Sequence, residues 1–153
     1  MNDYAALPNI DLAIRHFVYH HFVLEARPPS ISETAKAFNL AKEDARAAYE
    51  RLHNNQFIFL DPRTADIRMA NPFSAIPTNF EVQIEQKKYW ANCAWDMLGI
   101  PAALQKDALI TAIYEDTRAK VLLTVEDGQV RHAGGLVHFP LPVRQWYDDL
   151  ILT

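Results

Sequence analysis

The sequence has little cysteine, little glycine and no long hydrophobic run. Its one cysteine, Cys93, cannot form an internal disulfide, so nothing indicates an oxidising compartment. No stretch approaches the ~18 consecutive apolar residues of a membrane-spanning helix. Residues 1–9 also lack the basic and then apolar order of a signal peptide. These absences predict a soluble, cytoplasmic protein with no membrane partner.

The bulk composition is that of a globular chain. Its 153 residues are 50% hydrophobic and 22% charged, which suits one domain or two small domains that share a core. Nineteen acidic residues against fifteen basic ones give a net charge of −4, which argues against a nucleic-acid partner. The four glycines form no phosphate-binding loop, and the cysteine and histidines show no zinc-type spacing. His16 and His20 are four apart on a predicted helix and could chelate a metal, although solvent-facing histidines are the commoner case.

The first 70 residues show the element order of a winged helix. Apolar residues recur at helical spacing, and Ser30 with Glu33 matches a capping box that begins a helix. Later residues have the composition of two strands joined by a turn at Asp61 and Pro62. The predicted helices cover residues 9–26, 31–38 and 42–54, and the predicted strands cover residues 56–60 and 66–70. Residues 1–70 are therefore predicted to form a winged-helix-like N-terminal domain.

Residues 71–153 are predicted to form a core domain with a small mixed or antiparallel sheet. Residues 71–78 are apolar for a loop and predict a crossing segment that lies against the core. Asp127 and Gly128 give a strong turn signal between two strands. A helix over 85–98 is expected to contain Cys93 and to end at Gly99, before Pro101. Strands are expected at 80–84, 109–114, 120–126, 129–131 and 136–139, and a last helix at 143–152. The predicted fold class is α+β, with the sheet packed against the Cys93 helix.

Cys93 and Asp96 form the sharpest chemical pattern in the chain. Positions three apart lie on one helical face, so the thiol and the carboxyl can address the same space. Trp90 and Trp95 would remove water from the carboxyl and raise its pKa, which makes an aspartic acid a usable proton donor. Two turns inside a helix, the thiol would gain little from the helix dipole and would need a metal or a base. A second interpretation stays open, in which Cys93 is a small buried apolar residue.

His138 is a further candidate, because it lies in an apolar strand after two glycines. Glycines permit close approach of a backbone or a ligand, so His138 could act as the general base for Cys93. A hydrogen-bonded structural histidine is the alternative interpretation.

Residues 89–104, YWANCAWDMLGIPAAL, resemble the central helix of the organomercurial (alkylmercury) lyases. That family carries Cys-Ala-x-Asp followed by a Pro-Ala-Leu run. The winged-helix-like first part, residues 121–125 and residues 137–139 fall in a similar order, so the resemblance covers roughly residues 9–147. It implies protonolysis of a carbon–mercury bond, with two cysteine thiolates holding mercury and an aspartate moving the proton. Cys93 matches the first of these cysteines, and Asp96 matches the aspartate.

The sequence departs from the family at its second catalytic cysteine. The matching segment here is 133–135, with Gly134 the best-aligned position, and another family cysteine corresponds to Tyr114. With one thiolate, the second sulfur would come from an external small thiol. The resemblance implies no required cofactor, and it places mercury or another soft metal at Cys93. The residues expected to line a cavity beside the pair are Trp90, Trp95, Tyr114, Gly134 and His138.

Three functions are compatible with these residues. The first is a lyase-like enzyme that acts on a small molecule through Cys93 and Asp96, with a substrate that could differ from an organomercurial because the second cysteine is absent. The second is a winged-helix DNA-binding regulator, whose recognition helix would also carry Glu43, Asp44 and Glu50, a poor charge for facing phosphates. Its basic residues would be Lys42, Arg46, Arg51, His53, Arg63 and Arg68. The third is a lyase scaffold without catalysis that binds a soft metal or a small apolar ligand.

Overall fold

The computed structural model describes residues 9–131, 136–139, 142 and 145. Its first part is helical, with α1 (Asn9–Glu25), α2 (Ile31–Phe38) and α3 (Lys42–Asn54). These three helices lie where the sequence predicts them. The predicted capping box is present, because Ser30 Oγ accepts from the Glu33 backbone N–H and the Glu33 carboxylate accepts from the Ser30 backbone N–H.

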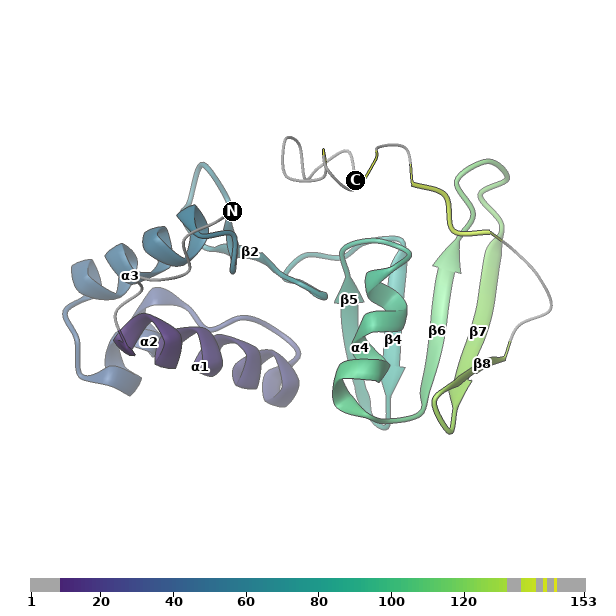
Figure 1. Ribbon diagram of the computed structural model, residues 1–153, viewed down its shortest axis with the longest axis horizontal. Coiled ribbons are helices and arrows are strands. Elements are labelled where there is room, and N and C mark those ends of the chain that lie inside the picture. Colours follow the sequence, from purple (N-terminus) through teal and green to yellow (C-terminus); the bar gives the residue numbers. More distant parts are fainter. Residues whose placement is uncertain (1–8, 132–135, 140–141, 143–144, 146–153) are drawn as a thin grey trace.

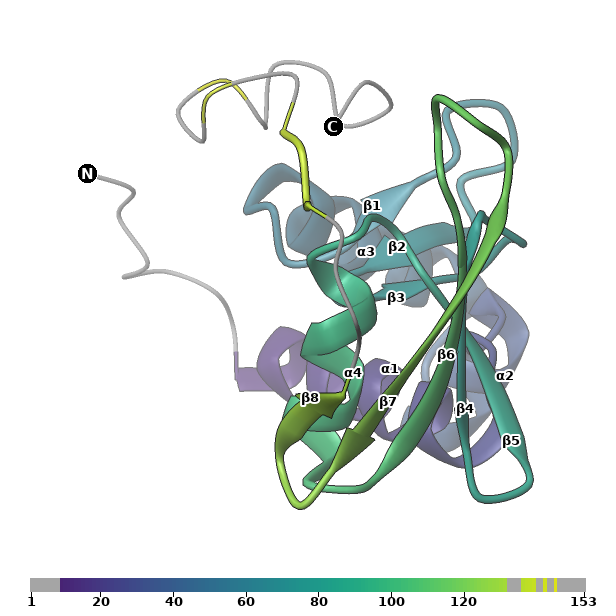
Figure 2. The ribbon, with the colours of Figure 1, turned by 90° about the vertical axis from the view of Figure 1, so that its right-hand side faces the viewer.

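The strands form one antiparallel sheet in the order β1-β2-β3-β5-β4-β6-β7-β8. Their bounds are β1 (Phe59–Leu60), β2 (Ile67–Ala70), β3 (Phe73–Ser74), β4 (Phe80–Ile84), β5 (Lys87–Ala91), β6 (Ala108–Ile113), β7 (Lys120–Glu126) and β8 (Gln129–Arg131). Helix α4 (Asp96–Leu104) lies along one face of this sheet (Figures 1 and 2). The α+β fold class is confirmed.

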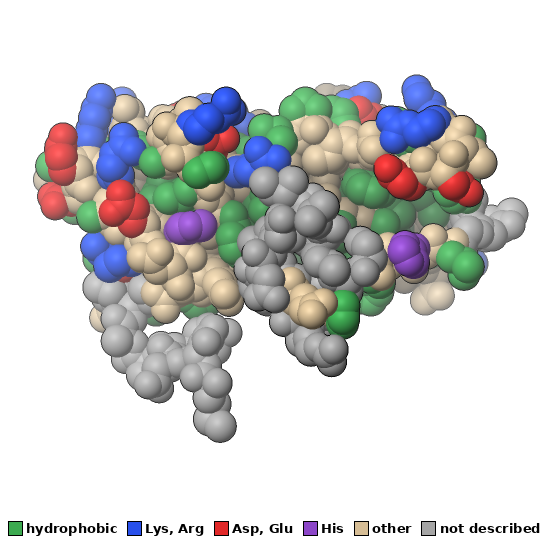
Figure 3. All heavy atoms as spheres, turned by 90° about the horizontal axis from the view of Figure 1, so that it is seen from above, with side chains coloured by type: hydrophobic (Ala, Val, Ile, Leu, Met, Phe, Trp, Pro, Cys, Tyr) green, Lys and Arg blue, Asp and Glu red, His purple; other side chains and the backbone are tan. Residues whose placement is uncertain are grey.

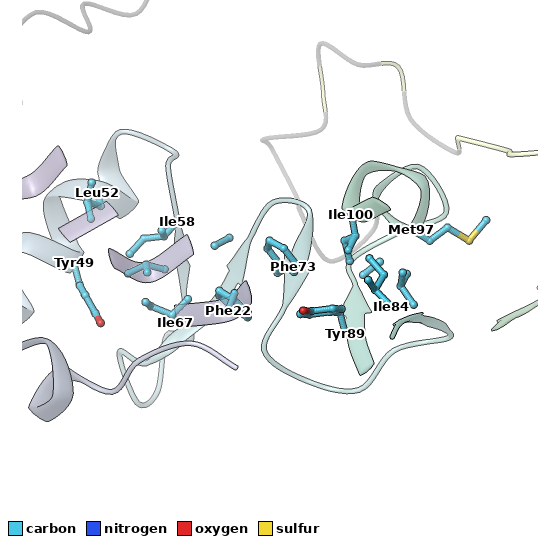
Figure 4. Close-up of a cluster of buried hydrophobic side chains, with 14 of the residues drawn as sticks. Phe22, Tyr49, Leu52, Ile58, Ile67, Phe73, Ile84, Tyr89, Met97 and Ile100 are labelled. Atoms are coloured by element: carbon cyan, nitrogen blue, oxygen red, sulfur yellow. The ribbon is translucent and has the colours of Figure 1, made fainter. Parts of the chain in front are cut away.

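One hydrophobic core joins the helical part to the sheet. Phe22 of α1 stacks on Phe73 of β3 with ring centroids 5.2 Å apart, and Phe73 meets Tyr89 of β5 at 5.6 Å (Figure 4). The Tyr89 hydroxyl also donates to the Val23 carbonyl at 2.9 Å. Since both the sheet and the core run through the predicted boundary at residue 70, the division into residues 1–70 and 71–153 stays a prediction.

The predicted helix over 85–98 is wrong. A hairpin occupies its first half, with β4 and β5 paired in the register Ile84 with Lys87 and Val82 with Tyr89. Glu85 makes the turn at a φ of 55°. Hairpin turns with positive φ usually contain glycine or asparagine, so a turn carried by glutamate gives no signal in the sequence.

Helix α4 also runs further than predicted. It continues through Gly99 and Pro101 and ends at Leu104, where Gln105 takes a φ of 51°. Ile100 and Pro101 are buried against the sheet, so packing outweighs the local tendency of glycine and proline to end a helix.

Two other predicted elements need comment. Residues 73–74, within the predicted crossing segment, form the short strand β3 between β2 and β5. Residues 136–139 belong to no strand, so that predicted strand is wrong. The predicted helix at 143–152 lies outside the described residues, apart from Gln145.

Candidate functional site

The candidate site lies at one edge of the sheet. Strands β5 and β6 both pair antiparallel with β4, so they run in the same direction and end at the same edge. The loop with Cys93 follows β5 at that edge, and Tyr114 follows β6. Strand β3 runs opposite to β5 and begins there, which brings the turn at Asn71 and Pro72 to the same place. The sheet topology therefore brings segments from three distant parts of the chain to the same side of the sheet as Cys93.

Cys93 lies at the N-terminal end of α4, not inside a helix as predicted. Its carbonyl accepts the backbone N–H of Met97 at 3.1 Å, which begins the first helical turn. Its sulfur accepts from the backbone N–H groups of Trp95 and Asp96. Backbone N–H groups at a helix N-terminus favour negative charge. The thiolate therefore receives the support from the helix end that the predicted helix would have denied it.

The Cys93 thiol and the Asp96 carboxyl are hydrogen-bonded to each other. Burial raises the pKa of Asp96, and hydrogen bonds from Asn92 and Cys93 oppose that rise. Burial also raises the pKa of Cys93, and the negative charge of Asp96 raises it further. Each of the two groups therefore loses its proton less readily than it would in water.

Asn92 is a polar residue of this site that the sequence reasoning did not select. Its amide Nδ2 donates to Asn71 Oδ1 at 2.9 Å and to Asp96 Oδ2 at 3.2 Å. Its position immediately before Cys93, in an otherwise apolar segment, was the available signal.

Helix α1 brings Tyr19 near the site. Burial raises the pKa of Tyr19, nearby Arg15 lowers it, and the negative charge of Asp96 adds to the rise. The Arg15 guanidinium lies over the Phe57 ring at 4.2 Å and near the Tyr19 ring at 5.7 Å. The negative charge of Asp96 therefore acts on a side chain of α1.

The structure distributes the predicted cavity residues over different surroundings. Trp90 alternates with buried Tyr89 and Ala91 in β5, so its side chain lies on the sheet face opposite α4. Trp95 is 60% exposed and meets the Phe139 ring edge-on at 6.3 Å. Tyr114 is half-buried at the end of β6.

The other two predicted positions lie near the end of the chain. Gly134 falls outside the described residues. His138 is exposed on the 136–139 segment. The role of His138 as general base for Cys93 stays a prediction.

The basic residues of the predicted DNA-binding surface serve other roles in part. Arg51 makes a two-bond ion pair with fully buried Asp11, at 2.6 and 2.7 Å. Arg63 lies 3.8 Å from the Asp61 carboxylate. Figure 3 shows basic and acidic side chains mingled over the face it displays. These observations do not favour a phosphate-binding surface.

The described residues hold neither a metal-binding cluster nor a membrane-spanning helix. No three His, Cys, Asp or Glu side chains gather there as a metal-binding group, although His16 and His20 stack with ring centroids 6.2 Å apart. None of the helices in the described ranges is long and apolar enough to cross a membrane.

The electrostatic coupling of the pair gives a testable prediction. Replacing Asp96 by asparagine removes the negative charge that raises the Cys93 pKa, so we expect the thiol to ionise at lower pH than in the wild type. Burial persists in the variant, so part of the rise should remain. The pH dependence of the rate at which iodoacetamide alkylates the protein measures the ionisation of this single cysteine. An unchanged or higher pKa in Asp96→Asn would contradict the coupling.

The fold and this pair together define an α+β protein with a thiol and an acid at a sheet edge. A family model described as "MerB: Alkylmercury lyase" matches residues 73–151, just over half of the chain. The chain therefore belongs to the alkylmercury lyase family, which confirms the resemblance seen in residues 89–104.

A solved structure shares the fold. It is described as "Crystal structure of the mercury-bound form of MerB2" and matches with a TM-score of 0.66 at 20% sequence identity. The match covers 84% of this chain and 61% of that chain, so this chain spans about three fifths of the relative's length. No curated protein matches the sequence.

Proposed function

We propose that this protein cleaves the carbon–mercury bond of an organomercurial by protonolysis, with Cys93 as the mercury ligand and Asp96 as the acid. The observation that carries the proposal is the hydrogen bond between the Cys93 thiol and the Asp96 carboxyl at the N-terminus of α4. Membership of the alkylmercury lyase family supports it. Mercury is soft and prefers thiolate ligands, so a lone thiol is a suitable point of capture.

The first step exchanges ligands on mercury. An organomercurial arrives bound to a small thiolate, and Cys93 sulfur replaces that thiolate. The Cys93 proton passes to Asp96, which already accepts the thiol hydrogen bond. Burial raises the pKa of Asp96, which favours transfer of the proton to this carboxyl.

The second step breaks the carbon–mercury bond. Asp96 delivers its proton to the carbon, and the electron pair of the carbon–mercury bond becomes the new carbon–hydrogen bond. The small thiolate binds the mercury that is left on Cys93, since the sequence offers no second cysteine. The products are a hydrocarbon and Hg²⁺ held by Cys93 and the external thiol. A second external thiol then displaces Cys93 and restores its proton.

Phenylmercury with excess small thiol tests the proposal. We expect the wild-type protein to release benzene, detectable by gas chromatography, and Cys93→Ala to release none above the rate without protein. The reason is that the variant lacks the only sulfur that can hold the substrate beside Asp96.

Equal benzene release by wild type and Cys93→Ala would defeat the enzymatic proposal. Binding of one equivalent of mercury that depends on Cys93, without benzene release, would instead show a lyase scaffold that binds a soft metal and does not catalyse.

A further inference from the structure

The Asn92 side chain connects two loops to the carboxyl of the candidate site. One amide nitrogen donates to both Asn71 Oδ1 and Asp96 Oδ2, at 2.9 and 3.2 Å. A carboxyl group can rotate about its bond to Cβ, and a single hydrogen bond leaves that rotation loosely held. Here the Cys93 thiol and the Asn92 amide both bind it, so two partners together fix the plane of the Asp96 carboxyl.

The turn that carries Asn71 packs against α4. Pro72 packs against Gly99 so closely that a Cβ at Gly99 would lie 3.3 Å from Pro72 Cβ. Glycine at this position therefore lets the 71–72 turn approach the helix that carries Asp96. Asn71 and Asp96 are thus held at fixed places on either side of the Asn92 amide.

The amide oxygen of Asn92 argues against a purely stabilising role for this residue. Its Oδ1 is buried with no hydrogen-bond partner among the described residues. A buried acceptor without a partner lowers stability, whereas an apolar side chain of the same size would not carry that cost. The benefit of an amide at this position therefore lies in the bonds that its nitrogen donates.

We propose that Asn92 is a positioning residue that holds the Asp96 carboxyl in line with Cys93, with Asn71 as its anchor. This inference rests on the proposed function, because it assigns Asn92 a part in the delivery of the Asp96 proton. Without the Asn92 amide, Cys93 can still bind mercury, but the Asp96 carboxyl is no longer oriented toward the mercury-bound carbon.

The substitution Asn92→Leu tests the assignment, since it keeps the side-chain size and removes both the donor and the buried acceptor. We expect kcat for benzene release from phenylmercury to fall about ten- to hundredfold, the range for losing an outer partner of a catalytic group. KM and the melting temperature should stay near the wild-type values. Asn55→Leu is a matched control: among the described residues the Asn55 amide donates only to the Arg51 carbonyl, so its loss should leave kcat unchanged.

Two results would overturn the assignment: a wild-type kcat in Asn92→Leu, or a fall in kcat that merely follows a fall in melting temperature. If Asn92→Leu does not fold, Asn71→Ala serves instead, because Asn71 is exposed and its loss frees the amide from the other side. A several-fold fall in kcat is then expected, and an unchanged kcat would overturn the assignment.

A separate readout distinguishes failure of this inference from failure of the proposed function. If the wild type releases no benzene, the proposed function fails. The rate of Cys93 alkylation by iodoacetamide at one fixed pH still reports whether Asn92 acts on Cys93 through Asp96. We expect Asn92→Leu to change the alkylation rate at least threefold when it is made in the wild-type protein. In the Asp96→Asn background, the same substitution should leave the alkylation rate unchanged. Equal effects in both backgrounds would show that Asn92 does not act through Asp96.

Discussion

The substitution Asp96→Asn is expected to separate mercury capture from bond cleavage. The variant keeps Cys93 and the backbone N–H groups that support its sulfur, so phenylmercury should still bind, as seen in the mass of the intact protein. Benzene release should fall by about 10²–10⁴-fold, the usual contribution of a general acid. An asparagine amide has no acidic proton to deliver to the carbon. Single-turnover release of benzene from the preloaded variant measures this step directly.

The controls for this experiment come from the same chain. Cys93→Ala should lose both capture and release, whereas Asp96→Asn should lose release alone. This difference would show that the two steps are distinct. Glu81→Gln makes the same change from acid to amide in β4, where Glu81 pairs with Lys88 at 2.9 Å, and should release benzene at the wild-type rate. If Asp96→Asn turns over like the wild type, the proton must come from solvent or from another group, and the role proposed for Asp96 is excluded.

Among the substitutions proposed for this protein, Arg51→Met is expected to cause the largest fall in the free energy of unfolding. Asp11 is fully buried in α1, and Arg51 of α3 binds both of its carboxylate oxygens. Removing the guanidinium leaves a buried carboxylate without its partner, which typically costs about 3–5 kcal/mol of unfolding free energy. Because the Arg51 side chain is 43% exposed, water can partly replace it, and we expect about 3 kcal/mol. Urea unfolding followed by circular dichroism measures the change.

Two further variants make this result specific to the ion pair. Arg46→Met lies on the same helix with an exposed side chain and should change the unfolding free energy by less than about 0.5 kcal/mol. The double variant Asp11→Leu with Arg51→Met removes both charges and should recover most of the loss. A loss below about 1 kcal/mol in Arg51→Met would mean that Asp11 is well solvated without Arg51.

The ion pair also changes the interpretation of the helical part. Positive residues on α3 suggest a recognition helix, yet Arg51 forms an ion pair with Asp11 that joins α3 to α1. A sequence shows the charge of a side chain but not its partner 40 residues away. Only the packing of α1 against α3 shows that Arg51 is paired with Asp11.

Turn chemistry explains why one hairpin was predicted and another was not. Asp127 and Gly128, with φ of 51° and 73°, join β7 to β8, and the residue types that favour this geometry are visible in the sequence. Glu85 adopts a similar φ of 55° between β4 and β5. Glutamate is not a residue that favours such turns, so the sequence gives no sign of a turn there, and the apolar and charged residues after it predict a helix. Pairing with β3 and β4 stabilises β5 in spite of that weak local signal.

The pairing of Cys93 with Asp96 was predicted on a spacing that still holds. Cys93 and Asp96 are three apart in the turn that leads into α4, where the Met97 N–H reaches the Cys93 carbonyl. Residues three apart in a helical turn lie on the same side, so the two groups meet although the helix begins later than expected. The position of the thiol at the helix end depended on the hairpin and was therefore missed.

The sequence by itself determined the family, the α+β class, the three N-terminal helices and the pairing of thiol with carboxyl. These follow from periodicity, from capping residues and from a motif of neighbouring residues, all of which act over a few positions. Only the tertiary structure decided that Asn71 and Asn92 meet at Asp96, that Gly99 receives Pro72, and that Arg51 neutralises Asp11. Those contacts join residues far apart in the chain, and strand order and helix packing alone bring such residues together.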